Sequence, residues 1–211
     1  MPRALRITVT TAAIGLIAVA TLSAAIKFTS TFKSLDAGAI SFTGRKVAAL
    51  VISNDVGLRV PAEEALVREL ASRGMLAVAT YGMVPKEELS KAETAKPWFE
   101  KAGVEGVVVV RPVSVDTRQT YTPSTWMSSS YSTLWNYYGY GWGAVYIPGS
   151  SQKQTVVVVE TTIFSVTKNQ LLWAAVTETT NARDLQAFVQ ELGKETVKEM
   201  QKQGLAKMQP K

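Results

Sequence analysis

The chain contains neither cysteine nor histidine. Without cysteine it can form no disulfide and offers no thiolate nucleophile. Without histidine it lacks the imidazole base of a Ser-His-Asp triad, and zinc sites built on either residue type are excluded. Any catalysis would therefore depend on carboxylates, lysine, serine or tyrosine.

Charged residues are also sparse, at 19 % of the 211 residues, whereas hydrophobic residues make up 46 %. These proportions are typical of a globular protein and not of a disordered one. The lysines and arginines behind the net charge of +6 are scattered along the chain, without the clustered basic footprint of a nucleic-acid-binding protein. We expect no nucleic-acid partner, no metal and no cofactor.

Residues 1–25 are typical of an export segment. Arg3 and Arg6 supply a positive end, residues 7–26 carry no charge, and Ser23-Ala24-Ala25 provides small residues at the cleavage positions. The pattern predicts cleavage before Ile26. The uncharged stretch of about 20 residues is also long enough to span a bilayer, so a retained anchor and a buried cytosolic helix are alternatives. We expect the folded domain in the periplasm or cell envelope.

The rest of the chain predicts one α/β (α+β) domain over residues 45–205, preceded by an extended tether at residues 26–44 and followed by a frayed tail at residues 206–211. Apolar runs and Pro/Gly boundaries predict alternating strands and helices. In the first half of this domain we expect five elements. They are a strand at residues 47–52, a helix from Pro61 to Gly74, a strand at residues 75–81, a helix from Pro85 interrupted at Pro97, and a strand at residues 107–110.

Two longer β-rich runs follow, at residues 155–167 and 171–180, and they predict an antiparallel hairpin. A last helix, capped by Asn181 or Asp184 and ended by Gly204, completes the domain. We therefore expect a mixed sheet of about five strands with three main helices, in which the C-terminal hairpin is followed by a helix.

Residues 119–152 form an aromatic segment without a single charge, which holds six of the seven tyrosines and three of the five tryptophans. Three interpretations compete: aromatic side chains that fold back over one end of the sheet, a protein-interaction surface, or a carbohydrate or lipid-headgroup surface. A surface for single-stranded nucleic acid would need basic residues in the segment, and there are none.

Four aromatic residues stand among glycines in this segment, where the backbone gives them little packing. We predict that they form an exposed or partner-covered surface. The candidate binding residues are Tyr137, Tyr138, Tyr140 and Trp142, together with Trp135. Tyr121 and Trp126 are expected to pack on the domain instead.

Four acids lie near predicted strands: Asp55, Asp116, Glu160 and Glu178. Their spacing ties no two of them together, so we interpret them as solvated strand faces and predict no catalytic or metal-ligating residue. Arg111, within an apolar strand, either pairs with an acid on a neighbouring strand or marks where that strand reaches the surface.

Several phrases resemble a group of uncharacterised bacterial envelope lipoproteins. They are Val51-Ile52-Ser53, the helix of residues 61–74, Ala102-Gly103-Val104-Glu105-Gly106-Val107, Tyr121-Thr122-Pro123, the Tyr/Gly/Trp run, Val158-Val159-Glu160-Thr161 and Leu171-Leu172-Trp173-Ala174. The order of elements is more remotely similar to the α/β domains of the curli-secretion lipoprotein, the lipoprotein activators of penicillin-binding proteins and the N-terminal domain of the Tol propeller protein.

The resemblance implies a non-enzymatic binding or assembly module of the cell envelope, with an envelope protein or a cell-wall or membrane-surface component as its partner. The alternative is an envelope hydrolase or metal-dependent enzyme that uses only carboxylates, Lys, Ser and Tyr. The chain departs from the lipoprotein pattern because no cysteine near Ala24-Ala25 can accept a lipid.

Overall fold

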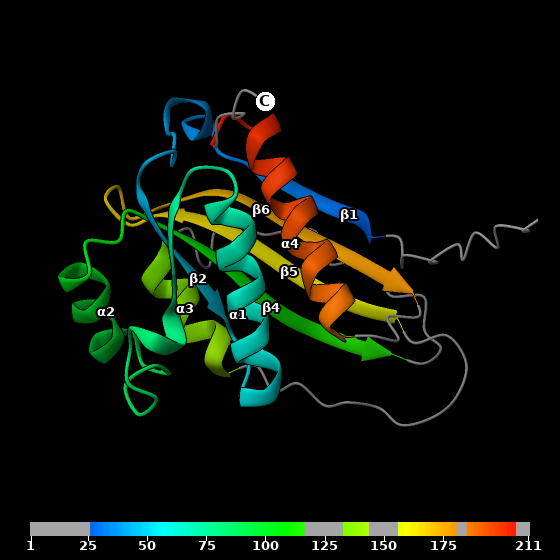
Figure 1. The fold of residues 1–211 in the computed structure, drawn as a ribbon, viewed down its shortest axis with the longest axis horizontal. Coiled ribbons are helices and arrows are strands. Elements are labelled where there is room, and N and C mark those ends of the chain that lie inside the picture. Colours follow the sequence, from blue (N-terminus) through cyan, green and yellow to red (C-terminus); the bar gives the residue numbers. More distant parts are fainter. Residues whose placement is uncertain (1–25, 117–132, 144–155, 181–184, 206–211) are drawn as a thin grey trace, which may run out of the picture.

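The computed structural model describes residues 26–116, 133–143, 156–180 and 185–205. They form an open six-stranded sheet with two helices on each face (Figure 1). The strands are β1 (Ile26–Lys33), β2 (Lys46–Val51), β3 (Leu76–Ala79), β4 (Gly106–Asp116), β5 (Val156–Ser165) and β6 (Gln170–Thr180). The α-helices are α1 (Val56–Ala71), α2 (Ala92–Lys101), α3 (Leu134–Gly143) and α4 (Leu185–Lys202), with short 3₁₀ turns η1 (Ala37–Ala39) and η2 (Thr80–Gly82).

The sheet has the order β1-β6-β5-β4-β2-β3 and is mixed, as the sequence predicts. Its parallel part places β2 between β3 and β4, so that Ala48 of β2 lies opposite Val78 and Val107. The antiparallel part runs from β4 through the β5–β6 hairpin to β1. The α/β class and the C-terminal hairpin followed by a helix are therefore confirmed.

The prediction of an extended tether over residues 26–44 is wrong. Residues 26–33 form the edge strand β1, which pairs with β6 from Ile26 opposite Thr179 to Lys33 opposite Trp173. Ile26 and Phe28 pack against the core, and the Phe28 ring meets the Trp173 ring edge-on at 6.3 Å. This strand raises the sheet from the expected five strands to six.

Two helix starts also differ from the prediction. The Asp55 carboxylate accepts hydrogen bonds from the amides of Gly57 and Leu58, so α1 starts at Val56 and continues through Pro61. The second helix starts at Ala92 instead of following Pro85, and continues through Pro97 without a restart. Both prolines lie inside their helices, where each removes one backbone hydrogen bond. The Asp55 cap determines the start of α1, whereas the N-cap residue of α2, Lys91, makes no side-chain cap hydrogen bond.

Helices α1 and α4 lie side by side on one face of the sheet and run parallel (Figure 1). The two helices are in close contact at Gly193 of α4, because a Cβ there would lie 3.4 Å from Cγ of Glu69. Their shared core contains Val47, Val51, Leu66, Leu70, Val108, Val110, Ile163, Trp173, Leu192, Val197 and Met200. The opposite face, under α2 and α3, buries Leu50, Val107, Val109, Phe99, Phe164, Leu134, Tyr137 and Tyr138.

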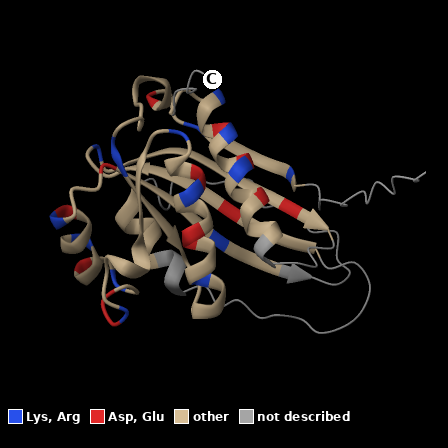
Figure 2. Cartoon of the chain, in the orientation of Figure 1, with Lys and Arg blue, Asp and Glu red and all other residues tan. Residues whose placement is uncertain are grey.

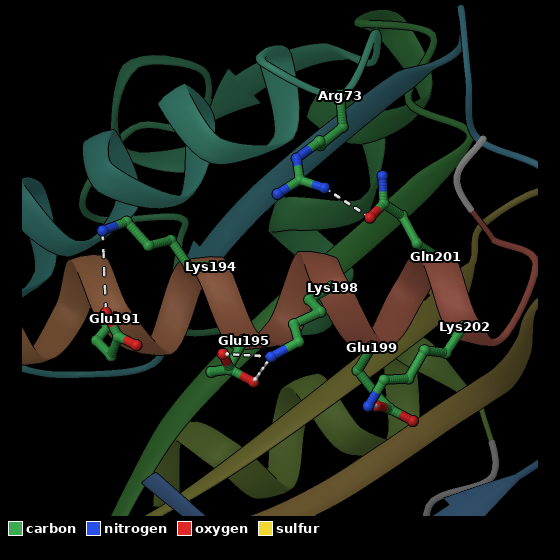
Figure 3. A network of polar contacts seen from close by, with 8 residues as sticks. All are labelled: Arg73, Glu191, Lys194, Glu195, Lys198, Glu199, Gln201 and Lys202. Atoms are coloured by element: carbon green, nitrogen blue, oxygen red, sulfur yellow. Dashed lines mark hydrogen bonds and ion pairs between the residues drawn. The ribbon is translucent and has the colours of Figure 1, made fainter. Parts of the chain in front are cut away.

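Charged side chains of both signs alternate over the outer surfaces of the helices, while most of the sheet is uncharged (Figure 2). On α4 they form a regular ridge of i,i+3 pairs (Figure 3): Glu191–Lys194 at 3.9 Å, Glu195–Lys198 at 3.0 Å and Glu199–Lys202 at 3.1 Å. Half-exposed pairs of this kind add little stability. We interpret the ridge as a solvated face.

The close approach of the Phe42 ring to β4 gives a testable prediction for the fold. A Cβ on Gly106 would lie 2.4 Å from Cε1 of Phe42, and Phe42 is buried. We expect Gly106→Ala to destabilise the domain by about 1–3 kcal/mol through overpacking, measured by urea unfolding. Gly139→Ala, where no atom lies within 4 Å of the added carbon, is the matched control. Equal stabilities of the two variants would contradict the prediction.

Candidate functional site

The sheet face under α3 contains a buried ionic cluster made of Arg111, Glu160 and Tyr137. Arg111 on β4 lies directly opposite Glu160 on β5. The Nε and Nη2 groups of Arg111 donate to Oε2 of Glu160 at 3.0 and 2.7 Å, and the Tyr137 hydroxyl of α3 donates to the same oxygen at 2.7 Å. The first alternative for Arg111, pairing with an acid on a neighbouring strand, is therefore confirmed.

Burial controls the ionisation of this cluster, because all three side chains are at most 7 % exposed. Burial raises the pKa of Tyr137 well above 10, and the Glu160 charge raises it further, so the phenol stays protonated and donates. Burial alone would lower the pKa of Arg111. The interactions of Arg111 with Tyr137 and Glu160 have the larger effect, and the pKa of Arg111 is raised. The cluster is held as an ion pair with a neutral phenol.

Two of the predicted binding residues are in the core. The prediction of an exposed surface is wrong for Tyr137 and Tyr138, both 0 % exposed. Residues 134–143 of the segment form α3, and Tyr137 and Tyr138 face Phe164 and Phe99 at ring distances of 5.4 and 6.0 Å. For this part of the segment, the interpretation that aromatic residues cover the sheet agrees with the structure.

Trp135 is half-buried between α2 and α3. Its ring meets Phe99 edge-on at 5.7 Å, and the Lys96 ammonium lies 5.9 Å from its centroid. Tyr140 and Trp142 belong to α3, but their side chains lie outside the described residues. Tyr121, Trp126, Asn181, Asp184 and the export segment of residues 1–25 lie outside them too.

The other predicted acids have separate positions. Asp55 caps α1, and Asp116 ends β4. Glu178 of β6 lies opposite Val158, two residues from Glu160 on the adjacent strand, and its Oε1 is buried without a hydrogen-bond partner among the described residues. Within the same part of the chain, no three acids are grouped so that they could hold a metal ion.

Sequence reasoning missed Glu63, because nothing in the local pattern distinguishes it from other acids near the start of a helix. Glu63 is 0 % exposed, and its two oxygens accept hydrogen bonds from the amides of Val51 at 3.1 Å and Tyr81 at 2.7 Å. It therefore ties α1 to the end of β2 and to η2. Burial raises the pKa of Glu63 from 4.5 to about 7, against the opposing effects of these amides and of Arg59.

The surface of the described domain has a groove between α1 and the N-terminal half of α4. It encloses about 200 Å³ and is lined by Leu58, Pro61, Glu64, Ala65, Arg68, Val189 and Gln190. Below Leu58 and Val189 a second, wholly apolar slot of about 30 Å³ reaches Val51, Val110 and Val159 of the sheet. The groove thus combines an apolar floor with a rim that carries one acid and one base.

No helix of residues 26–116, 133–143, 156–180 or 185–205 is both long and apolar enough to cross a membrane. The segment predicted as a signal or anchor lies outside these ranges, so this finding leaves that prediction as it stands.

No family model matches the sequence. No curated protein matches it either. Among solved structures, the PelC dodecamer from Paraburkholderia phytofirmans is similar with a TM-score of 0.46 at 12 % identity, over 84 % of this chain and 97 % of that chain. A variant of this dodecamer has a TM-score of 0.43 at 15 % identity, over 84 % and 98 % of the two chains. These scores are too low to transfer any property to this chain.

Proposed function

We propose that the protein is a non-enzymatic binding or assembly module of the cell envelope, and that the groove between α1 and α4 binds an amphipathic helix of another envelope protein. One observation carries the proposal. In this groove, apolar side chains of both helices reach an open cavity next to the half-exposed charged side chains of Glu64 and Arg68. Binding of a helix in a groove uses such a floor and rim.

The rim defines the partner's chemistry. Glu64 and Arg68 are about half exposed and lie 4.0 Å apart, too far for a strong mutual bond. Oε1 of Glu64 accepts a hydrogen bond from the Tyr81 hydroxyl at 2.9 Å. A partner helix with a base and an acid one turn apart would place the base at Oε2 of Glu64 and the acid at Arg68. An apolar side chain between those two would then lie over Ala65, the groove residue between Glu64 and Arg68 on α1.

The state of the described acids supports a binding role over the enzymatic alternative. A general acid or base must reach its substrate. Glu63 and Glu160 are at most 5 % exposed, and each is engaged by hydrogen bonds within the domain. The envelope location rests on the proposed export segment, in which an uncharged stretch follows Arg3 and Arg6.

Site-specific photo-cross-linking in intact envelopes tests the proposal. A photo-reactive residue at Gln190, which is exposed on the groove rim, should give one discrete adduct with another protein. The same residue at Lys198, equally exposed on the solvated ridge of α4, should give none. Because partner charges should face Glu64 and Arg68, we expect Arg68→Glu to reduce the adduct at least several-fold.

Two outcomes would contradict the proposal. One is equal labelling from Gln190 and Lys198. The other is an adduct at Gln190 with the mass of two copies of this chain, which would mean that the groove binds the protein itself.

A further inference from the structure

A second candidate binding site, separate from the groove, lies at the carboxyl ends of the parallel strands. Strand β2 leads through α1 to β3 on one side, and β3 leads through α2 to β4 on the other side of β2. The two helices lie on opposite faces of the sheet. In open α/β sheets, ligands bind at the carboxyl ends of the strands beside the point where the strand order reverses, which here lies between β2 and β4.

Arg59, in the second turn of α1, lies at this edge of the sheet. It is only 7 % exposed, and its Nε is buried without a hydrogen-bond partner. Within the described residues, its guanidinium makes no hydrogen bond and no ion pair. A buried donor without a hydrogen-bond partner is costly, and Nε of Arg59 is such a donor, so this side chain lacks an acceptor within the described residues.

The carboxylate of Glu63, next to Arg59, already accepts hydrogen bonds from other groups. Glu63 lies one turn further along α1, on the same helix face as Arg59, and the Arg59 charge acts to lower the pKa of Glu63. Both Glu63 oxygens are nevertheless bound by the amides of Val51 and Tyr81. The start of the helix is occupied as well, because the Asp55 carboxylate caps it. Of these charged side chains, Arg59 is therefore the one whose guanidinium N–H groups bind no other group of the described residues.

We propose that Arg59 binds a small oxyanion, a carboxylate or phosphate group of a ligand, at the carboxyl edge of β2 and β3. The planar fork of arginine presents parallel N–H groups that match two oxygens of such a group. This site lies on the sheet-facing side of α1 and differs from the groove proposed above, so either proposal can fail without the other.

Glu63 makes this binding depend on pH. Below pH 7 Glu63 becomes neutral, and the positive charge of Arg59 is no longer offset. The other ionisable groups on the neighbouring segments are Asp55, Glu64 and Tyr81. The hydrogen bond from Tyr81 to Glu64 raises the pKa of Tyr81 above 10, so its phenol stays neutral. We therefore expect anion affinity to increase as pH falls from 8 to 6.

Thermal unfolding of the purified full chain tests the site, with phosphate or acetate added against sodium chloride of equal ionic strength. We expect one of the two anions to raise Tm by several degrees in a saturable way, and the effective anion identifies a phosphate or a carboxylate ligand. Arg59→Met should abolish the rise. Arg68→Met, which changes an exposed arginine of the same helix, should keep it.

Arg59→Lys provides a second variant, because it keeps the charge and removes the fork. It should bind the effective anion at least several-fold more weakly. Sulfate, whose charge is constant over this range, should bind more tightly at pH 6 than at pH 8, and Glu63→Gln should remove the difference. The proposal is overturned if neither anion gives a saturable rise, or if Arg59→Met or Arg59→Lys retains the full effect.

Discussion

Replacing Glu160 with leucine should destabilise the domain by about 3–5 kcal/mol, the usual cost of removing one partner from a buried ion pair. The substitution removes the carboxylate that binds Arg111 and Tyr137, while the Arg111 charge stays buried. A domain of ordinary stability has about 5–15 kcal/mol in total, so this variant should be close to unfolding. Urea denaturation measures the loss.

The double variant, Arg111→Met with Glu160→Leu, should recover most of that loss because no charge is left behind. Arg45→Met is the control, since Arg45 pairs with Glu105 on the surface with 52 % and 35 % of the two side chains exposed, and such pairs contribute at most about 1 kcal/mol. If Glu160→Leu lowers the free energy of unfolding by less than Arg45→Met does, the buried ion pair does not stabilise the sheet.

Replacing Glu63 with glutamine should remove a strong dependence of stability on pH. The carboxyl has a pKa raised from 4.5 to about 7 in the folded state, so the folded protein binds the proton more tightly than the unfolded chain does. Its stabilising contribution is therefore complete below pH 4.5 and is lost as pH rises to 7. At about 1.4 kcal/mol for each pKa unit, the change is about 3 kcal/mol.

The measurement compares the free energy of unfolding of wild type and Glu63→Gln from pH 4.5 to pH 8. The wild-type value, relative to the variant, should fall by about 3 kcal/mol across this range. Glu64→Gln, which changes the exposed neighbour of Glu63, should show the same dependence of the free energy of unfolding on pH as wild type. Parallel curves for wild type and Glu63→Gln would show that Glu63 does not exchange its proton in this range.

The parts of the fold that could be predicted are those whose local pattern is strong. Continuous apolar runs such as residues 47–52 and 107–110 are typical of strands buried on both faces. The edge strand β1 was missed because Lys27, Thr31 and Lys33 are exposed and a register shift between Phe28 and Ser30 interrupts the alternation of apolar residues. Phe28 therefore packs on one core and Phe32 on the other. From composition alone, such a strand cannot be distinguished from a polar linker.

Helix α3 was not predicted because Gly139, Gly141 and Gly143 lower the local helix propensity. The helix has a signal that could have been used: Leu134, Tyr137 and Tyr138 follow the i, i+3, i+4 spacing of a buried helix face. The glycines instead suggested an exposed loop, and the tyrosines were assigned to its surface. Packing on Phe99 and Phe164 overrides the propensity.

The polar sites depended on contacts between distant residues. Pairing of Arg111 with Glu160 needs the register of β4 against β5, which the sequence leaves open. Glu63 is bound by Tyr81, a residue 18 positions away on η2. No spacing rule connects these two positions, so its burial and raised pKa could be found only from the structure.

The most direct test of the proposed binding function is the sequence of the peptide attached at Gln190. Digestion of the cross-linked adduct followed by mass spectrometry identifies it. The proposed function predicts a segment of another envelope protein in which an apolar residue stands between a base and an acid one helical turn apart. A peptide of this chain, a segment without that pattern, or a lipid or sugar adduct would contradict it.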